Sequence, residues 1–145
     1  MKLAARAIVG ISAAAIAGTM AMGTAQAAPG NYHIETRTCN VEDAGTDSRV
    51  EARFNGTAGS SGWILLDNSG DDRERGRTDV YAKSLPDVGT VTSVDIYFAN
   101  NDDSPHWCLE EVTVRTPNGL TTIHPYHNWL RRVYSKAAPL RLNAA

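Results

Sequence analysis

The feature that most constrains this chain is a series of short segments in which apolar and polar residues alternate. In residues 49–55, Val50, Ala52 and Phe54 share one side of an extended chain, and polar, mostly charged residues share the other. A period of two is typical of a strand with one buried face. Further segments with strand-like composition are residues 32–40, 63–66, 78–85, 91–98 and 107–115.

Turn-forming residues separate these segments. Gly, Pro, Asn and Asp gather at residues 43–45, 55–56, 68–70, 86–89, 100–105 and 117–119. Short strands roughly ten residues apart, with no helical periodicity between them, predict an all-β, antiparallel sandwich rather than alternating strands and helices. In residues 78–85 the alternation sets Val80 and Ala82 on the face opposite Tyr81.

Residues 1–27 resemble a secretory signal peptide. Two positive charges open the segment, residues 7–22 are uncharged, and Ala25-Gln26-Ala27 supplies the small-x-small pattern of a signal peptidase site. A membrane anchor is the alternative, but the uncharged run is shorter than the ~20 apolar residues that a spanning helix needs. We therefore expect cleavage before Ala28 and an extracellular protein that is not transmembrane.

The net charge of the chain argues against one class of partner, nucleic acid. The whole chain has 14 basic and 16 acidic residues, and loss of Lys2 and Arg6 leaves 12 against 16, a net charge of −4. Such a chain lacks the basic excess that a phosphate backbone attracts, so nucleic acid is not expected as a partner. We expect one domain over residues 28–135 and a frayed tail over residues 136–145.

The chain has two cysteines, Cys39 and Cys108. In an oxidising compartment such a pair is expected to form one disulfide, which would close a loop of about 70 residues. The alternative is a pair of free, buried thiols.

Three connecting loops are unusually acidic: residues 42–47, 67–79 and 100–104. Carboxylate, amide, hydroxyl and backbone carbonyl oxygens are the ligands that Ca²⁺ takes, and a bound cation would relieve the repulsion between clustered carboxylates. Solvated turns are the alternative, because Asp and Asn also favour turns for local reasons. No loop has the spacing of an EF-hand.

Ordered motifs run through residues 32–130. They lie at residues 44–50, 66–68, 71–79, 85–89, 104–110, 117–119 and 128–130. In this order they resemble the PLAT domain, the sandwich shared by polycystins, lipoxygenases and clostridial alpha-toxin. The resemblance indicates a small secreted single-domain member of that family.

The resemblance implies eight strands in two four-stranded sheets. It also implies a non-catalytic module that docks on a lipid surface or on a protein, often with Ca²⁺ at the loops of one end. The ligands that it implies are Gly45, Thr46 and Asp47 in the first loop, Asp71, Asp72 and Glu74 in the second, and one of Asn100, Asn101, Asp102 or Asp103 in the third.

Two departures from the family pattern matter. Cys108 stands where an aromatic residue is usual, which supports a bridge particular to this protein. The loop tips at residues 44–45 and 68–70 carry no large apolar residue, which argues against membrane insertion.

The residues that could support catalysis lack the necessary context. His124 and His127 would face opposite sides of a strand. Ser60 and Ser61 lie in a Gly-Ser-Ser-Gly turn rather than at a nucleophile elbow. The three tryptophans, Trp63, Trp107 and Trp129, could stack on carbohydrate or fill a core. We therefore expect a binding module that is not an enzyme. A secreted inhibitor or toxin-like effector that needs neither Ca²⁺ nor lipid is the alternative, and a small hydrolase is a distant third.

Overall fold

The computed structural model describes residues 28–99, 106–131 and 133–145. These residues form eight strands and no α-helix, and therefore no helix that could cross a membrane. The strands are β1 (Gly30–Thr38), β2 (Val50–Gly56), β3 (Gly59–Leu65), β4 (Thr78–Leu85), β5 (Val91–Phe98), β6 (Trp107–Arg115), β7 (Thr121–Leu130) and β8 (Leu140–Asn143).

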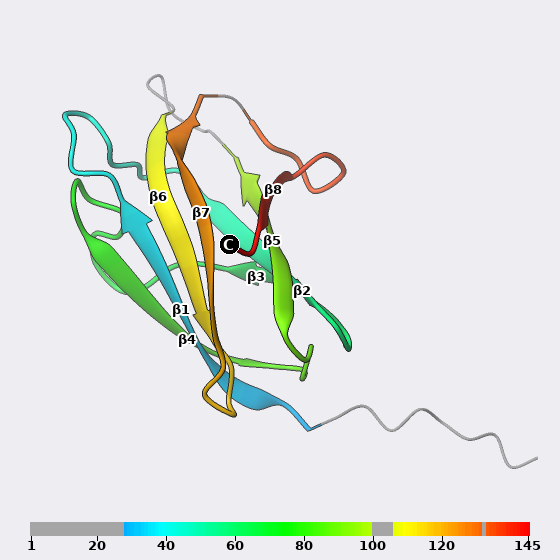
Figure 1. The fold of residues 1–145 in the computed structure, drawn as a ribbon. Coiled ribbons are helices and arrows are strands. Elements are labelled where there is room, and N and C mark those ends of the chain that lie inside the picture. The colour runs from blue at the N-terminus through cyan, green and yellow to red at the C-terminus, as the bar shows by residue number, and fades with distance from the viewer. Residues whose placement is uncertain (1–27, 100–105, 132) are drawn as a thin grey trace, which may run out of the picture.

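The strands form two antiparallel four-stranded sheets that pack face to face (Figure 1). One sheet has the order β4-β1-β6-β7 and the other β3-β2-β5-β8. The predicted all-β sandwich of two four-stranded sheets is confirmed.

A single apolar cluster fills the space between the sheets. In β1, Tyr32 and Ile34 point inward and are fully buried, as the period of two requires. Trp107 of β6 is also fully buried, and its indole nitrogen donates a hydrogen bond of 3.0 Å to the hydroxyl of Thr38. Of the three tryptophans, Trp107 therefore belongs to the core, whereas Trp63 is only half-buried.

Strand β4 alternates as predicted, with Tyr81 facing the core and Val80 facing solvent at 47% exposure. Asp79 lies on the buried side because its carboxylate accepts a hydrogen bond of 2.7 Å from the backbone of Arg73 and pairs with Arg77 at 3.1 Å. The apolar Val80 thus lies outside, and a period of two by itself does not say which face is buried.

The C-terminal residues do not fray. Strand β8 pairs with β5, from Leu140 opposite Ile96 to Asn143 opposite Ser93. Leu142 is 2% exposed and joins the core. The expectation of a frayed tail over residues 136–145 is wrong for β8, because one buried leucine and a row of backbone hydrogen bonds hold it.

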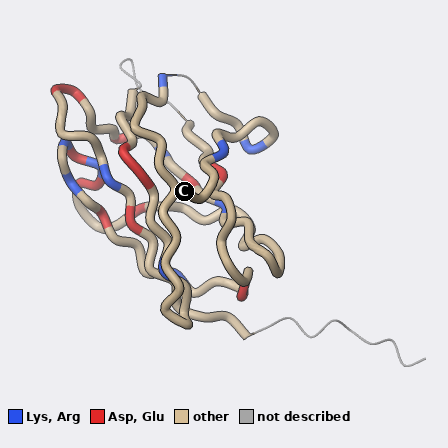
Figure 2. Tube along the Cα trace, viewed as in Figure 1, with Lys and Arg blue, Asp and Glu red and all other residues tan. Residues whose placement is uncertain are grey.

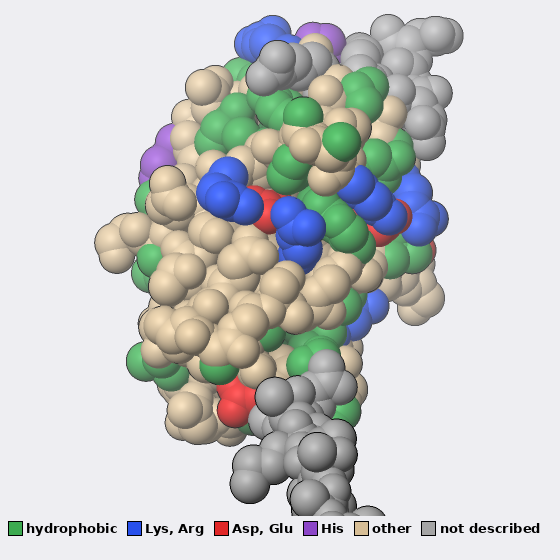
Figure 3. All heavy atoms as spheres, turned by 90° about the vertical axis from the view of Figure 1, so that its right-hand side faces the viewer, with side chains coloured by type: hydrophobic (Ala, Val, Ile, Leu, Met, Phe, Trp, Pro, Cys, Tyr) green, Lys and Arg blue, Asp and Glu red, His purple; other side chains and the backbone are tan. Residues whose placement is uncertain are grey.

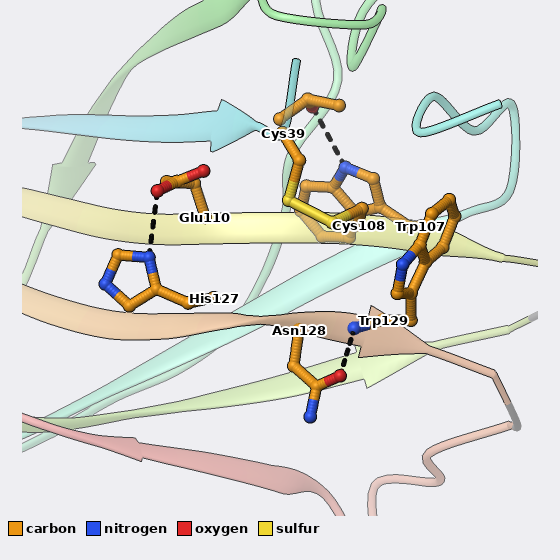
Figure 4. The surroundings of a disulfide bond; sticks show 8 residues. Cys39, Trp107, Cys108, Glu110, His127, Asn128 and Trp129 are labelled. Atoms are coloured by element: carbon orange, nitrogen blue, oxygen red, sulfur yellow. Dashed lines mark hydrogen bonds and ion pairs between the residues drawn. A yellow bond between two sulfur atoms is a disulfide. The ribbon is translucent and has the colours of Figure 1, made fainter. Parts of the chain in front are cut away.

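Cys39 and Cys108 form a disulfide with a Cα–Cα distance of 5.4 Å, as predicted. It joins the residue after β1 to the second residue of β6. With Ala44 the two cysteines make a small second apolar cluster, and Trp129 packs against it (Figure 4). The alternative of two free thiols is therefore wrong.

Candidate functional site

Two of the predicted acidic loops lie against each other at one end of the sandwich (Figure 1). Loop one (residues 39–49) follows β1, and loop two (residues 66–77) precedes β4. The backbone nitrogen of Thr46 donates to the carbonyl of Arg73 at 3.2 Å. A Cβ atom on Gly45 would lie 2.9 Å from that same carbonyl, so the close contact of the loops requires glycine there.

Arg73 holds the two loops together from inside. Arg73 is 5% exposed, and its guanidinium group donates to the carbonyl of Leu66 in loop two at 2.7 Å and to that of Ser48 in loop one at 3.3 Å. Its backbone has a φ of 59°, a conformation that the hydrogen bond to Asp79 helps to fix. In the sequence, Arg73 is one of three arginines in the acidic stretch of residues 67–79, and no pattern distinguishes it from Arg75 and Arg77.

The contact between the loops leaves an open hollow of about 590 Å³. It is lined by Asp43, Ala44, Gly45, Thr46, Asp47, Glu74 and Arg75. The structure therefore brings together four of the predicted ligands, three from loop one and Glu74 from loop two. It adds Asp43, which the ligand prediction missed although the residue lies in the same acidic run. Figure 2 shows the acidic and basic positions gathered along these loops.

The other two loop-two ligands do not line this hollow. Asp72 is 6% exposed, and its carboxylate accepts hydrogen bonds from the backbone nitrogen of Asn68 at 2.6 Å and from its side chain at 3.3 Å. Asp71 is exposed, and its carbonyl accepts a hydrogen bond from Arg77 at 2.8 Å. The expected convergence of Asp71 and Asp72 with Asp47 and Glu74 is therefore absent from this conformation.

Asn100, Asn101, Asp102 and Asp103 lie outside the described residues. Within the described ranges, no three carboxylate, imidazole or thiol groups are close enough to hold a metal ion.

The donor chemistry of the hollow nevertheless suits Ca²⁺. Asp43, Asp47 and Glu74 offer carboxylate oxygens, which are the hard ligands that Ca²⁺ takes. The hydroxyl of Thr46 already accepts a hydrogen bond of 3.1 Å from the backbone of Ser48, and Arg75 is turned toward Asn40 at 3.2 Å. The residue types fit a calcium site, but the loops would have to close further to complete one.

The profile of the PLAT/LH2 domain family matches residues 32–137 of this chain. The chain belongs to this family. The PLAT domain is a lipid- or protein-binding module.

Among curated relatives, the lipoxygenase homology domain-containing protein 1 of Mus musculus is 31% identical over 106 residues. That match covers 69% of this chain but only 5% of the mouse protein, so the chain spans a small fraction of this relative's length.

Solved PLAT structures share the fold of this one. A coral 8R-lipoxygenase, described as calcium-activated through a C2-like domain, has a TM-score of 0.69 at 22% identity, covering 79% of this chain and 17% of that one. The alpha-toxin of Clostridium absonum has a TM-score of 0.62 at 18% identity, covering 80% of this chain and 33% of that one. At these identities the likeness shows the fold alone.

The two histidines of β7, His124 and His127, have structural partners. His124 is fully buried between the hydroxyl of Thr122 at 3.0 Å and the carbonyl of Leu142 at 3.3 Å, and burial lowers its pKa. His127 is exposed and contacts Glu110 at 2.9 Å (Figure 4).

Ser60 and Ser61, the two serines of the Gly-Ser-Ser-Gly segment, lie in β3, and Ser61 has a structural role. The hydroxyl of Ser61 accepts a hydrogen bond of 3.0 Å from the backbone nitrogen of Phe54, where the pairing of β2 with β3 is irregular.

Proposed function

We propose that this PLAT domain is a secreted, non-catalytic docking module that binds a lipid surface or a protein through loops one and two, with the help of Ca²⁺. The observation that carries the proposal is the hollow between the loops, where Asp47 and Glu74 meet Gly45 and Thr46. These residues come from two loops that a shared set of hydrogen bonds holds at one end of the sandwich.

Asp43, Asp47 and Glu74 would hold the ion, with oxygens of Gly45 and Thr46 beside them. Bound Ca²⁺ supplies a bridge to phosphate or carboxylate groups on a partner. The calcium activation described for the coral lipoxygenase, through a C2-like domain, supports this role for the same fold. The third loop, with the amide oxygens of Asn100 and Asn101 and the carboxylates of Asp102 and Asp103, remains part of the proposed ligand set.

The shape of the loop end favours shallow docking over insertion. Val41 is 45% exposed in loop one, but it is a small side chain and no large aromatic residue of loops one and two accompanies it. With few apolar side chains to bury in hydrocarbon, binding to vesicles is expected to depend on charge and to weaken as salt rises.

Thermal melting with and without Ca²⁺ tests the proposal. A ligand that binds only the folded state, at a concentration a hundredfold above its Kd, raises the free energy of unfolding by about 2.7 kcal/mol. Millimolar Ca²⁺ should therefore raise the melting temperature. The paired change Asp47→Asn and Glu74→Gln should abolish the rise. Asp87→Asn, in the turn before β5, is the matched control and should keep it.

Two results would contradict calcium binding: an unchanged melting curve in 10 mM Ca²⁺ and a flat calorimetric titration. Extracellular modules bind Ca²⁺ with Kd values of about 10⁻⁴ to 10⁻³ M, so this concentration is high enough to decide.

The second candidate function is protein binding without Ca²⁺ or lipid. The observation that favours it is the engagement of Asp72 inside loop two, which leaves fewer free carboxylates for an ion. Co-sedimentation with phosphatidylserine vesicles separates the candidates. Calcium-dependent pelleting supports the first function, and absence of pelleting in both Ca²⁺ and chelator, together with a flat calorimetric titration of Ca²⁺, supports the second.

A further inference from the structure

The outer face of the β3-β2-β5-β8 sheet holds a fully buried carboxylate, that of Asp95 in the middle of β5. Arg53 of β2 donates two hydrogen bonds to it, at 2.7 and 3.1 Å. Arg141 of β8 donates two more, at 2.7 and 3.0 Å. Asn55 adds a fifth at 3.0 Å. The carboxylate is buried because these side chains cover it.

A second carboxylate on this face repeats the arrangement. Glu51 is 5% exposed, and one of its oxygens pairs with Arg49 at 2.8 Å while the other pairs with Lys136 at 2.7 Å. Lys136 comes from the segment between β7 and β8, which therefore reaches across to β2. Each buried acid on the face thus holds two cations in place.

Both acids remain ionised at physiological pH. Burial by itself would raise the pKa of Asp95, but the hydrogen bonds from Arg141, Arg53 and Asn55 outweigh it and lower that pKa to about 2. Burial would also raise the pKa of Glu51, but the hydrogen bonds from Lys136 and Arg49 outweigh it and lower that pKa.

The cations cover the acids and face outward (Figure 3). The exposed fractions of their side chains are 51% for Arg49, 30% for Arg53, 47% for Lys136 and 56% for Arg141. Among the described hydrogen bonds, Arg53 and Arg141 bind Asp95 through Nε and Nη2, which leaves their Nη1 groups available to an outside acceptor.

Two aromatic rings lie between the cations. Trp63 and Tyr97 meet edge to face with ring centroids 6.5 Å apart. The guanidinium of Arg53 lies 4.9 Å from the Trp63 ring, and the ammonium of Lys136 lies 5.8 Å from it. Because cations already contact this ring, it is poorly placed to stack on a sugar.

We propose that this cationic face, formed by Arg49, Arg53, Trp63, Tyr97, Lys136 and Arg141, docks a protein partner through a carboxylate-rich segment. Four cations stand over two acids, so the face is positive on a chain whose net charge is −2. Carboxylates are the bidentate partners that guanidinium groups prefer.

The chemistry of the face favours a protein as its partner. Trp, Tyr and Arg are the residues that dominate the energy of protein interfaces. Because the buried acids already hold the cations in position, a partner orders fewer side chains on binding. The face shares no residue with the hollow between loops one and two, so the module would offer two separate contacts.

An octaglutamate peptide, titrated into ¹⁵N-labelled protein in chelator, tests the proposal. The largest shifts should fall on the Trp63 indole and on the backbones of β2 and β5. Lys136→Gln and Trp63→Leu should each weaken binding at least about fivefold. The matched control is Arg115→Gln, which removes a positive charge from β6 in the other sheet. It should leave the affinity for the peptide unchanged.

Both test variants keep the buried acids paired, since Glu51 retains Arg49 and Asp95 retains both arginines, and their melting curves check the fold. Shifts spread over both sheets, or equal affinity for octalysine, would overturn the proposal. The same titration with phosphatidylserine vesicles in chelator gives a further check. If the vesicles perturb the signals of these residues more strongly than the peptide does, the proposal is overturned in favour of a membrane surface. Because the titration lacks Ca²⁺, its outcome is independent of the calcium proposal.

Discussion

At the scale of single residues, the buried charges show how local partners decide what an acid does. Asp95 lies on an outer sheet face and is nonetheless fully buried, because Arg53 and Arg141 cover it. Asp72 and Asp79 lie in the acidic stretch that the sequence associates with metal binding, yet both are buried by contacts within that stretch. Composition identifies such acids but not their partners, which depend on strand register and loop conformation.

The first prediction concerns Asp95. Its folded-state pKa of about 2 lies below the usual 3.8, so the ionised carboxylate stabilises the fold above pH 4 and loses this effect as the pH falls toward 2. The shift corresponds to about 2 kcal/mol at most, because the half-exposed Arg141 is screened by water. Asp95→Asn should be destabilised at pH 7 and should approach the wild type in urea unfolding at pH 2.

A constant difference between Asp95→Asn and the wild type across this pH range would contradict the assignment. Asp87→Asn, which replaces an exposed acid in a turn, controls for loss of charge.

At the scale of elements, the strands with clear alternation could be predicted and the two at the end of the chain could not. Strand β7 contains Pro125, which argues against a strand, but β7 is the edge of its sheet and tolerates a residue without an amide hydrogen. Its pairing with β6 is irregular beside that proline, and His127 has a φ of 50°. Strand β8 has four residues, too few for a period to be visible. Only the family resemblance supplied the count of eight strands.

The second prediction tests whether β8 is part of the cooperative fold. Leu142→Ala removes a buried side chain from the core and should lower the free energy of unfolding by about 2–4 kcal/mol. Asn143→Ala, at the exposed neighbouring position, should change it by less than about 0.5 kcal/mol. Equal and small effects in urea unfolding would mean that the end of the chain is frayed after all.

The third prediction concerns the disulfide that joins β1 to β6. The disulfide spans 69 residues and lowers the conformational entropy of the unfolded chain, which stabilises the fold by about 4 kcal/mol. The double change Cys39→Ala and Cys108→Ala should therefore lower the free energy of unfolding by about that amount. The expected readout is a fall of several degrees in melting temperature. Two titratable thiols in denatured protein from its native medium would show that the bond does not form there.

At the scale of the whole molecule, ordered motifs were enough to predict the sandwich and the end at which its loops meet. They did not predict how the loops meet. The hollow depends on Gly45 fitting against the backbone of loop two and on Arg73 reaching both loops, and neither contact has a sequence period. The cationic face was equally hidden, because its charges come from four separate segments of the chain.

The fourth prediction is export. If residues 1–27 direct secretion, expression of the full chain in a secreting bacterial host should release protein whose N-terminal sequence begins at Ala28. A change of Ala27 to a large residue, such as Ala27→Phe, should block processing. Retention of an intact Met1 in soluble, cell-internal protein would contradict this interpretation.

The order of strands also affects how fast the molecule folds. Strand β1 pairs with β4 and β6, neither of which is its neighbour in sequence, and the last strand, β8, completes the other sheet. Domains dominated by such non-local pairings fold slowly, in about milliseconds to seconds. In the native fold, the pairing of β1 with β6 brings Cys39 and Cys108 together. If residues 1–27 direct export, slow folding would favour translocation of the unfolded chain, and the disulfide would form on the oxidising side of the membrane.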